Sequence, residues 1–509
     1  MAEPMGALRP RPPGHVCAWT AGRRVAAVGL RRQGGSREAT QRRTAATEAP
    51  LDWRDDSDIG ACSSLEDLPL IEGDTGGLPI IGRTLDFMKN QHGFMGNHVR
   101  KHGLVSRANL FGKNVAVVGG NDNLQKIFTK DPKLLNQHFM KDFQLLSGHH
   151  SFWHKDGDAH MALKRLMAPS FSQAALRERV PDLVRTAEHW CKKWANKGSI
   201  LAVEEVQRYT LSVTMDAILG LDFPVGGKSL DEMYYKMKTF SKGLYTFGID
   251  LPFTTFGKSM AARRELVGMI TEGIERFQQN PELTGAMRSL MDERDEDGNG
   301  LTVPQLQDNI LTLIYAGIDT TALPLTTAFM KMAQHPEVWE RMKKEQEDII
   351  AEYGPVMTAE AIDAMDYTLA VFWESIRIMP PAASVFRRPT RTFEINGCRV
   401  PEGWLVMPLV GVNTQQLDQR WPGDMDFCPH RHFEKTDEPV TDTAFGLGPH
   451  ACIGRNLSLL ESKILLATMA RGFDYTVVNP DQARRYAPLP WPVDGAAMVI
   501  EERKGACTG

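Results

Sequence analysis

The segment that most constrains the fold is Phe445-Gly446-Leu447-Gly448-Pro449-His450-Ala451-Cys452-Ile453-Gly454. Its glycines and proline predict a tightly turned loop, and Cys452 lies where a helix from about Ile453 to Arg471 is predicted to begin. Free amides and the positive end of a helix dipole favour a thiolate there, and the small neighbours let a flat ligand approach the sulfur. Such a thiolate suits the proximal side of a haem iron. The alternative interpretation is a buried structural cysteine on a glycine turn.

A second segment, Ala316-Gly317-Ile318-Asp319-Thr320-Thr321, lies inside the long apolar helix predicted over residues 305–335. Gly317 costs about 1 kcal/mol relative to alanine in a helix interior, so it needs a reason, and close approach of a ligand is one. Asp319 and Thr320 place a carboxylate beside a hydroxyl, as a proton relay to dioxygen requires. Pro324 deprives the Thr320 carbonyl of its usual amide partner, which predicts a kink. The alternative is an Asp-Thr-Thr run that faces solvent.

Two opposite charges, Glu374 and Arg377, share one face of a predicted helix that Pro380-Pro381 ends. Most pairs of this kind are solvated and contribute less than about 1 kcal/mol. This pair gains meaning because the segment Phe427-Cys428-Pro429-His430-Arg431 supplies a further cation later in the chain.

In order and spacing, these segments resemble the cytochrome P450 family of haem-thiolate monooxygenases. The cysteine loop is similar to the family signature Phe-x-x-Gly-x-Arg-x-Cys-x-Gly and matches it at Phe445, Gly448, Cys452 and Gly454, with His450 where arginine is usual. The helix segment resembles the family's oxygen-side motif, with Ala316, Gly317, Asp319 and Thr320 in the site positions. The resemblance is closest to the branch whose members modify sterols, retinoids and carotenoids.

The resemblance implies a haem b cofactor with Cys452 as axial ligand of the iron. It also implies that Glu374, Arg377 and Arg431 form a buried structural triad behind the cysteine loop. The segment 153–171 resembles the family's helix that reaches the haem propionates, which makes His160 and Lys164 propionate ligands, with Arg387 as a third. His450 can donate a hydrogen bond to a propionate, but its charge depends on pH.

The expected fold is mainly α with a smaller β portion, with the haem between the long oxygen-side helix and the helix that follows the cysteine loop. Apolar residues at three- and four-residue spacing predict further helices over residues 178–196, 203–219, 258–278 and 336–352. Strands are predicted at Val115–Val118, in a hairpin over 393–400 that turns at Asn396-Gly397, and over 474–501. Residues 76–509 are therefore expected to form a single haem-binding catalytic domain.

The charge distribution sets the first 75 residues apart. Residues 1–47 carry nine Arg, no Lys and two Glu, a net charge of +7, whereas residues 48–75 carry nine acidic residues and one Arg, a net charge of −8. The first segment has the composition of an organellar transit peptide and the second that of a disordered acidic linker. We therefore expect a chloroplast or a mitochondrion, the alternative being a non-targeting basic tail on a cytoplasmic or peripheral membrane protein.

Composition excludes several other classes of protein. The chain of 509 residues has a formal net charge of −4, which argues against nucleic acid as a partner. The sequence contains no window that reads as an uninterrupted membrane span of about 18 apolar residues, so no transmembrane anchor is expected, and peripheral membrane contact stays open. The seven scattered cysteines include no C-x-x-C pair and indicate neither a disulfide framework nor a cysteine zinc site.

The expected function is insertion of one atom of O₂ into a small apolar, isoprenoid-derived substrate, such as a sterol, retinoid or carotenoid, by a monomeric enzyme. A ferredoxin or a flavoprotein reductase is expected as separate electron donor, and a basic docking patch for it is predicted at Lys155, Lys164, Arg165 and Arg455. The substrate pocket is expected to be lined by the 145–152 loop and residues 315–320, 382–385 and 488–491. Two other functions stay open: a haem-dependent isomerase or dehydratase that needs no external electrons, and a non-catalytic haem-binding sensor.

Overall fold

The computed structural model describes residues 65–130, 134–139, 141–221, 228–244, 246, 248–412, 426–433, 443–486 and 489–503. The leader over 1–47, the linker up to residue 64 and Pro488 of the expected pocket lie outside these residues, so what the sequence predicts for them stays a prediction. Residues 65–509 fall into one compact unit by their contacts.

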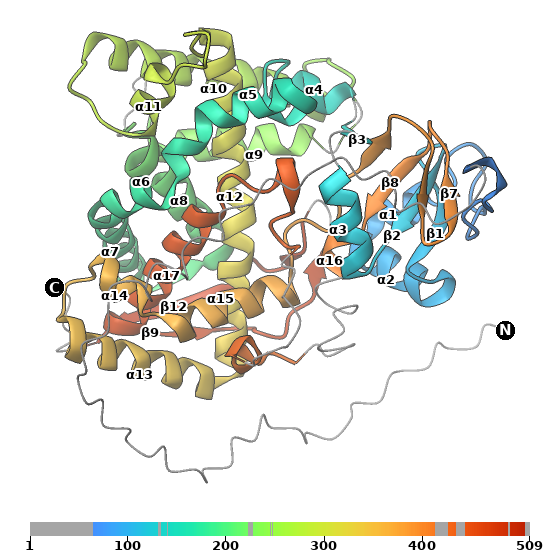
Figure 1. Cartoon of the computed structure of the whole chain (residues 1–509). Helices are drawn as coiled ribbons and strands as arrows, with labels where there is room; N and C mark the ends of the chain where they lie inside the picture. The colour runs from blue at the N-terminus through green and yellow to red at the C-terminus, as the bar shows by residue number, and fades with distance from the viewer. Residues whose placement is uncertain are drawn as a thin grey trace, which may run out of the picture. The chain divides into compact units, whose positions relative to one another are not determined.

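Helices dominate the described residues, as Figure 1 shows. The α-helices are α1 (Thr84–Lys89), α2 (Gln91–His102), α3 (Asn121–Lys130), α4 (Lys141–Ser147), α5 (Gly157–Met167), α6 (Gln173–Glu178), α7 (Val180–Lys197), α8 (Ala202–Ser212), α9 (Leu230–Gly243), α10 (Thr255–Gln279), α11 (Ala286–Asp292), α12 (Val303–Gln334), α13 (Pro336–Tyr353), α14 (Ala359–Asp363), α15 (Asp366–Ile378), α16 (Val410–Val412) and α17 (Arg455–Gly472). A π-helical segment, η5 (Val213–Leu219), continues α8, and short 3₁₀ helices include η3 (Phe152–His154) and η7 (Pro429–Phe433). The long helices predicted from periodicity are confirmed, and the one predicted over 203–219 is α8 together with η5.

The strands form small sheets. They are β1 (Val105–Leu110), β2 (Lys113–Val118), β3 (Leu135–Gln137), β4 (Ser199–Leu201), β5 (Arg387–Pro389), β6 (Phe393–Ile395), β7 (Cys398–Val400), β8 (Leu405–Pro408), β9 (Phe473–Val477), β10 (Arg484–Arg485), β11 (Trp491–Pro492) and β12 (Ala497–Glu502). One sheet has the order β1-β2-β8-β5-β3, in which β2 and β8 are parallel, and another has the order β4-β12-β9. The predicted 393–400 hairpin is β6 and β7, and its turn has positive φ at Asn396 and Gly397, as a type I′ turn requires.

The helix α12 is the central element of the helical part, in yellow in Figure 1. A capping box fixes its start, because the Thr302 hydroxyl accepts from the Gln305 amide while the Gln305 side chain accepts from the Thr302 amide. The helix then continues through Pro324 to Gln334. Among the described residues it is the one segment long and apolar enough to cross a membrane, but 72% of its most apolar window is buried inside the protein. It is therefore the core helix of this fold.

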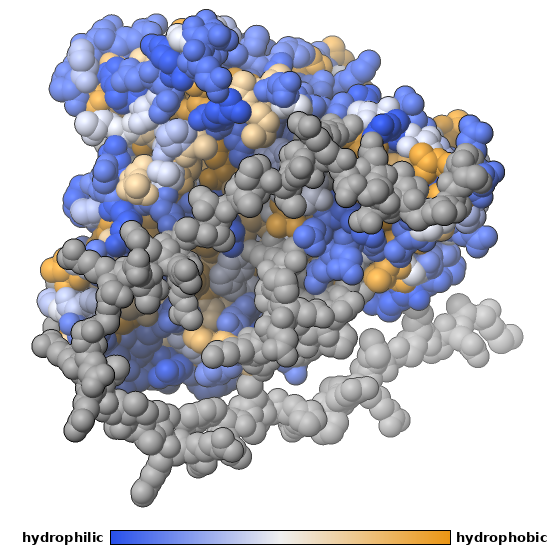
Figure 2. Space-filling view, viewed as in Figure 1, coloured by the Kyte–Doolittle hydropathy of each residue, from blue (hydrophilic) through white to orange (hydrophobic). Residues whose placement is uncertain are grey.

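Several helices pack against α12. It contacts α8, α10, α15 and α17, and together they bury one large apolar cluster that runs from Leu146 to Ile500. The five-stranded sheet has its own, smaller cluster around Val115, Val117 and Met407. The fold class predicted from the sequence, mainly α with a smaller β portion, is confirmed. On the face drawn in Figure 2, hydrophilic residues make up most of the coloured surface.

Candidate active site

Two predicted site segments, one on α12 and one before α17, lie next to each other. The Thr321 hydroxyl donates to the Ser458 hydroxyl at 3.1 Å, which joins α12 to the second turn of α17. Thr320 is exposed although residues 321–330, which follow it on α12, are buried, and Cys452 is exposed as well. Thr320 and Cys452 are therefore exposed close to the place where α12 contacts α17, as two residues that face a bound cofactor would be.

The cysteine loop has the tight geometry that its glycines predict. The Cys452 amide donates to the Phe445 carbonyl at 2.8 Å, and Gly446 and Gly448 both have positive φ. A Cβ on Gly448 would lie 2.4 Å from the Phe128 carbonyl oxygen, so only glycine fits there. Helix α17 begins directly after the loop at Arg455, two residues later than predicted.

The environment of the Cys452 thiol contains opposing influences. Although the residue is exposed, surrounding protein atoms desolvate the thiolate and raise the pKa of Cys452. The backbone amides of Gly454 and Arg455 and the Lys164 ammonium act in the opposite direction. The protein alone therefore leaves a thiol, and a cation bound to the sulfur would complete the stabilisation of the thiolate.

The four residues predicted to face the propionates come together beside this loop. The His160 and His450 rings lie 3.8 Å apart between centroids, and Lys164 Nζ donates to the Pro449 and Ala451 carbonyls at 2.6 and 2.9 Å. Desolvation, reinforced by the nearby charges of His160, Arg387 and Lys164, lowers the pKa of His450 to about 2. This concentration of basic groups in a desolvated place suits an anionic ligand.

Two of these basic groups also hold neighbouring chain segments. Arg387 is almost fully buried and donates from Nη1 to Gln137 Oε1 at 2.8 Å. His160 Nε2 lies 3.2 Å from the Pro449 carbonyl oxygen. A carboxylate the sequence did not point to, Asp156, lies 3.8 Å from His450 Nε2, and burial raises the pKa of Asp156. The propionate roles of the four residues stay predictions.

The predicted triad behind the loop contains a fourth member. Glu374 Oε1 accepts from Arg377 Nη2 at 2.8 Å and from Arg431 Nε at 2.9 Å, and its Oε2 accepts from Arg377 Nε at 2.8 Å. His432 Nε2 lies 3.0 Å from the same Oε2, and the Cys428 amide donates to Oε1 at 2.9 Å. Burial opposes ionisation of Glu374, but these partners outweigh it and lower the pKa of Glu374 to about 2. Sequence reasoning missed His432, although its place directly after Arg431 was a usable signal.

The oxygen-side segment of α12 contacts α8 and η5. Asp319 Oδ1 accepts from the Gln207 amide at 2.5 Å, and the Thr320 hydroxyl donates to the Ala316 carbonyl at 2.5 Å. Protein atoms surround the Asp319 carboxyl, and this desolvation raises its pKa from 3.8 to about 6. A Cβ on Gly317 would lie 3.0 Å from Thr214 Oγ1, so contact with η5 gives this glycine a reason that the sequence did not predict.

The loop expected to line the substrate pocket is fixed to the first half of α12. The Asp308 carboxylate accepts from the His150 amide at 3.0 Å, Asn309 Oδ1 accepts from the Phe152 amide at 2.8 Å, and the Thr312 hydroxyl donates to Ser151 Oγ at 2.9 Å. Downstream, Tyr315 packs edge-on against Trp153 and Phe240, with ring centroids 5.8 and 5.7 Å apart. Tyr315 therefore joins an aromatic cluster, of which Phe240 belongs to the buried core.

The predicted docking patch is only partly available. Lys164 Nζ donates to carbonyls of the cysteine loop, Arg165 contacts Glu296 at 3.4 Å, and the Arg455 guanidinium lies 5.9 Å from the centre of the Phe445 ring. Lys155 is half-buried.

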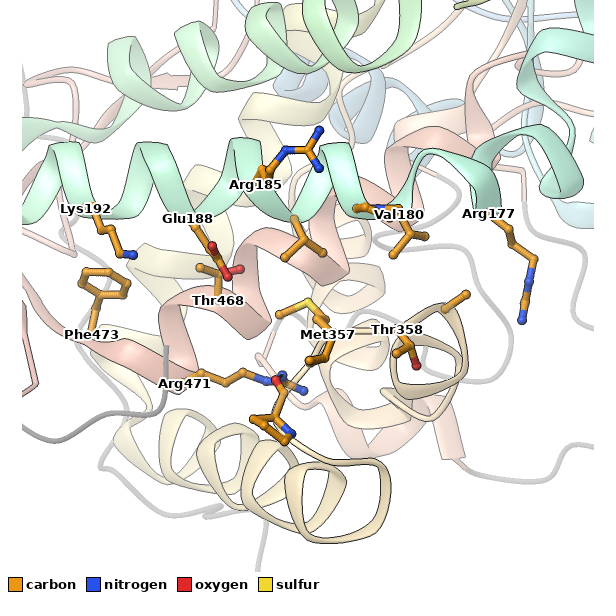
Figure 3. Close-up of a pocket in the computed structure, with 15 residues that line it drawn as sticks. Arg177, Val180, Arg185, Glu188, Lys192, Met357, Thr358, Thr468, Arg471 and Phe473 are labelled. Carbon is orange, nitrogen blue, oxygen red and sulfur yellow. Dashed lines mark hydrogen bonds between the residues drawn. The ribbon is translucent and has the colours of Figure 1, made fainter. Parts of the chain in front are cut away.

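A separate cavity of about 400 Å³, drawn in Figure 3, does not coincide with this site. It lies between α7, the Pro355–Ala359 segment and the end of α17, and Val180, Met357 and Phe473 are among its lining residues. Two of its arginines are already engaged, since Arg177 pairs with Asp363 and Arg471 donates to the Pro355 carbonyl. The cavity shares no residue with the predicted site.

The sequence of this chain matches the family model described as cytochrome P450 over residues 73–493. The chain belongs to this family. A solved structure titled "Retinoic acid bound cyanobacterial CYP120A1" superimposes with a TM-score of 0.78 at 27% identity, over 86% of this chain and all of that one. Abscisic acid 8'-hydroxylase 2 of Arabidopsis thaliana is 28% identical over 83% of this chain and 88% of its own length. Cytochrome P450 26A1 of Gallus gallus is 26% identical over 84% and 89%.

As a cytochrome P450, the protein is a haem-thiolate monooxygenase that uses O₂, a substrate and a separate electron donor. The residues present fit the cofactor. An exposed cysteine in an amide-lined loop suits the iron, and the basic cluster of His160, Lys164, Arg387 and His450 suits two propionates. The family, the fold and the haem cofactor that the sequence predicts are thereby confirmed.

Proposed function

We propose that this cytochrome P450 hydroxylates a small apolar isoprenoid carboxylic acid. The observation that carries the proposal is the contact of Tyr315 with the rings of Trp153 and Phe240, on the same helix as the exposed Thr320 and about one turn before it. It is supported by two relatives whose names mention abscisic acid and retinoic acid, which are both isoprenoid acids of moderate size. A sterol is the alternative substrate class.

Haem supplies the activation of dioxygen, and the chain supplies substrate binding and protons. The half-buried Trp153 and Tyr315 contact the apolar surface of the substrate and exclude water, and the buried Phe240 supports the Tyr315 ring. Asp319 has a pKa of about 6, so it exchanges a proton readily near neutral pH, as a general acid must. The Thr320 hydroxyl is one residue along the helix and is exposed. Once this hydroxyl no longer donates to the Ala316 carbonyl, it is able to pass the proton on.

The haem-loaded full chain tests the substrate class. Binding of retinoic acid, abscisic acid and cholesterol is measured from the shift of the haem absorption band, and products made under ¹⁸O₂ are identified by mass spectrometry. We expect a shift and one ¹⁸O atom in the product with at least one of the two acids. A shift and product with cholesterol alone would contradict the proposal.

We propose that a separate ferredoxin or flavoprotein reductase supplies the electrons and docks near the exposed Arg165 and Arg455. Reconstitution with NADPH and each donor class in turn should give product with one of the two. Product without any donor would instead favour the isomerase or dehydratase alternative, and no turnover with either donor would favour the sensor. The proposed monomer is tested by light scattering of the haem-loaded protein.

We propose that residues 1–47 direct the chain to a chloroplast or a mitochondrion. The support is their basic, acid-poor composition. A fusion of residues 1–75 to a fluorescent protein should accumulate in one of these organelles, and replacing the arginines by glutamine should release it. Cytosolic or membrane-bound fluorescence of the unchanged fusion would overturn this proposal.

A further inference from the structure

Three successive residues of α12 contact α8 and its π-helical continuation. Gly317 lies against Thr214, the Ile318 carbonyl accepts from the Thr210 hydroxyl at 3.1 Å, and Asp319 accepts from Gln207 Nε2 at 2.5 Å. Thr210, Thr214 and Gln207 are all buried. The segment that carries the predicted proton relay is therefore held by one neighbouring helix, and the last of the three contacts is made to the acid itself.

The orientation of the Gln207 amide is fixed from its other end. Tyr234 on α9 donates from its hydroxyl to Gln207 Oε1 at 2.8 Å, and the Tyr234 side chain is almost completely buried. The Arg208 guanidinium lies 4.1 Å from the centre of the Tyr234 ring and is itself paired with Asp231 at 2.7 Å. An ionised carboxylate only accepts hydrogen bonds, so the amide nitrogen must face Asp319 and the amide oxygen must face the tyrosine.

We propose that Gln207, locked by Tyr234, is the positioning residue of Asp319 and thereby controls proton delivery on the oxygen side of this cytochrome P450. An amide does not relay a proton without changing its bonding, so Gln207 acts by holding the carboxyl group and not as a link in a proton wire. The other charged and titratable groups that act on this carboxyl lie on α9 and are Lys238 and Tyr234. The proposal rests on the family's monooxygenase activity and on Asp319 as proton donor, and it does not depend on the substrate class.

The test uses the haem-loaded full chain with Gln207→Leu and Tyr234→Phe. The first reading is an infrared titration of the Asp319 carboxyl, identified as the band that Asp319→Asn removes, which needs no substrate. Loss of a hydrogen bond to the carboxylate should raise the midpoint by about one pH unit in Gln207→Leu and by about half as much in Tyr234→Phe. The matched control is Thr210→Val, which removes a neighbouring α8–α12 hydrogen bond and should leave the midpoint unchanged.

The second reading is coupling, the ratio of product formed to NADPH consumed, measured across pH with whichever substrate binds. If protons are delivered to the wrong oxygen atom, O₂ takes up the two electrons and two protons and is released as hydrogen peroxide. Peroxide should therefore be formed in place of product. We expect coupling to fall about ten-fold in Gln207→Leu and its pH profile to move with the infrared midpoint. Unchanged midpoints in both variants, or equal shifts in Thr210→Val, would overturn the proposal. If none of the tested substrates binds, the proposed substrate class is wrong, but the infrared titration still tests the role of Gln207.

Discussion

Glu374 and Asp319 are two carboxyl groups inside the same protein with opposite surroundings. Two arginines, a histidine and a backbone amide meet Glu374, and its pKa falls to about 2. A single uncharged amide donates to Asp319, and its pKa rises to about 6. The first group stays charged in any physiological condition, whereas the second changes its protonation near neutrality. The difference shows how one fold separates a carboxylate that holds structure from one that moves protons.

The strongest way to break this contrast is Glu374→Gln. Two buried guanidinium groups would then lack their anion, and breaking a buried pair in this way costs about 3–5 kcal/mol. We expect protein that unfolds at much lower urea concentration and fails to retain haem, measured by circular dichroism and by the carbon monoxide difference spectrum. Glu360→Gln, which removes an exposed partner of Arg177, is the matched control and should leave both readings unchanged. Normal haem retention in Glu374→Gln would contradict the structural role.

Asp319→Asn should impair the chemistry while the protein still folds and binds haem. Loss of a general acid typically lowers the rate about 100-fold, equal to about 2.7 kcal/mol in the barrier. We expect product formation to fall by this factor while peroxide rises and the carbon monoxide spectrum stays normal. Thr320→Ala should show the same spectrum and the same uncoupling. Full product formation by Asp319→Asn would remove Asp319 from the mechanism.

The contributions of the two carboxyl groups to the free energy of unfolding should also depend on pH in opposite directions. Glu374 has a lowered pKa, so its contribution is complete above pH 4.5 and is lost as the pH falls toward 2. Asp319 has a raised pKa, so its contribution is complete below pH 3.8 and is lost as the pH rises through 6. Asp319→Asn should therefore be more stable than wild type above pH 6, by about 2 kcal/mol or less. Thermal unfolding of both proteins from pH 4 to 8 checks this, and parallel curves would count against the raised pKa.

The smallest expected effect is that of His432→Phe. The change removes one hydrogen bond from Glu374 and leaves the two arginines, so we expect a loss of about 1 kcal/mol in urea unfolding. His432→Gln keeps a donor and should recover most of the loss. If both variants are as stable as wild type, His432 does not contribute to stability, and Arg377 and Arg431 alone hold Glu374.

Much of this molecule could be predicted from its sequence, and the successes share a cause. Periodicity predicts α12 and α13 because their apolar faces repeat regularly, and Asn396-Gly397 predicts its turn because few residues accept two positive φ angles in succession. The cysteine loop was predictable because Gly446 and Gly448 adopt the positive φ angles that glycine accepts most readily.

The contacts that sequence reasoning missed are between elements far apart in the chain. Gln207 lies 112 residues from Asp319, and no local pattern marks an amide on one helix as the partner of an acid on another. The explanation given for Gly317 was incomplete for the same reason, because Thr214 belongs to a different helix. Predicted propionate ligands such as Lys164 are found near the loop, but their hydrogen bonds to its carbonyls could not be foreseen from charge alone.

The fixing of the 148–152 loop to α12 has a consequence for engineering. Gly148 has positive φ, and a Cβ there would lie 2.1 Å from the Asp308 carboxyl carbon, so loop and helix are matched to each other at this point. The same α12 carries Asp319 and Thr320 about three turns later. If this loop is replaced by that of a related protein to alter substrate selectivity, residues 308, 309 and 312 must therefore be taken from the same related protein. A loop moved without these residues would lose its hydrogen bonds to α12 and would disturb the part of the helix that carries Asp319 and Thr320.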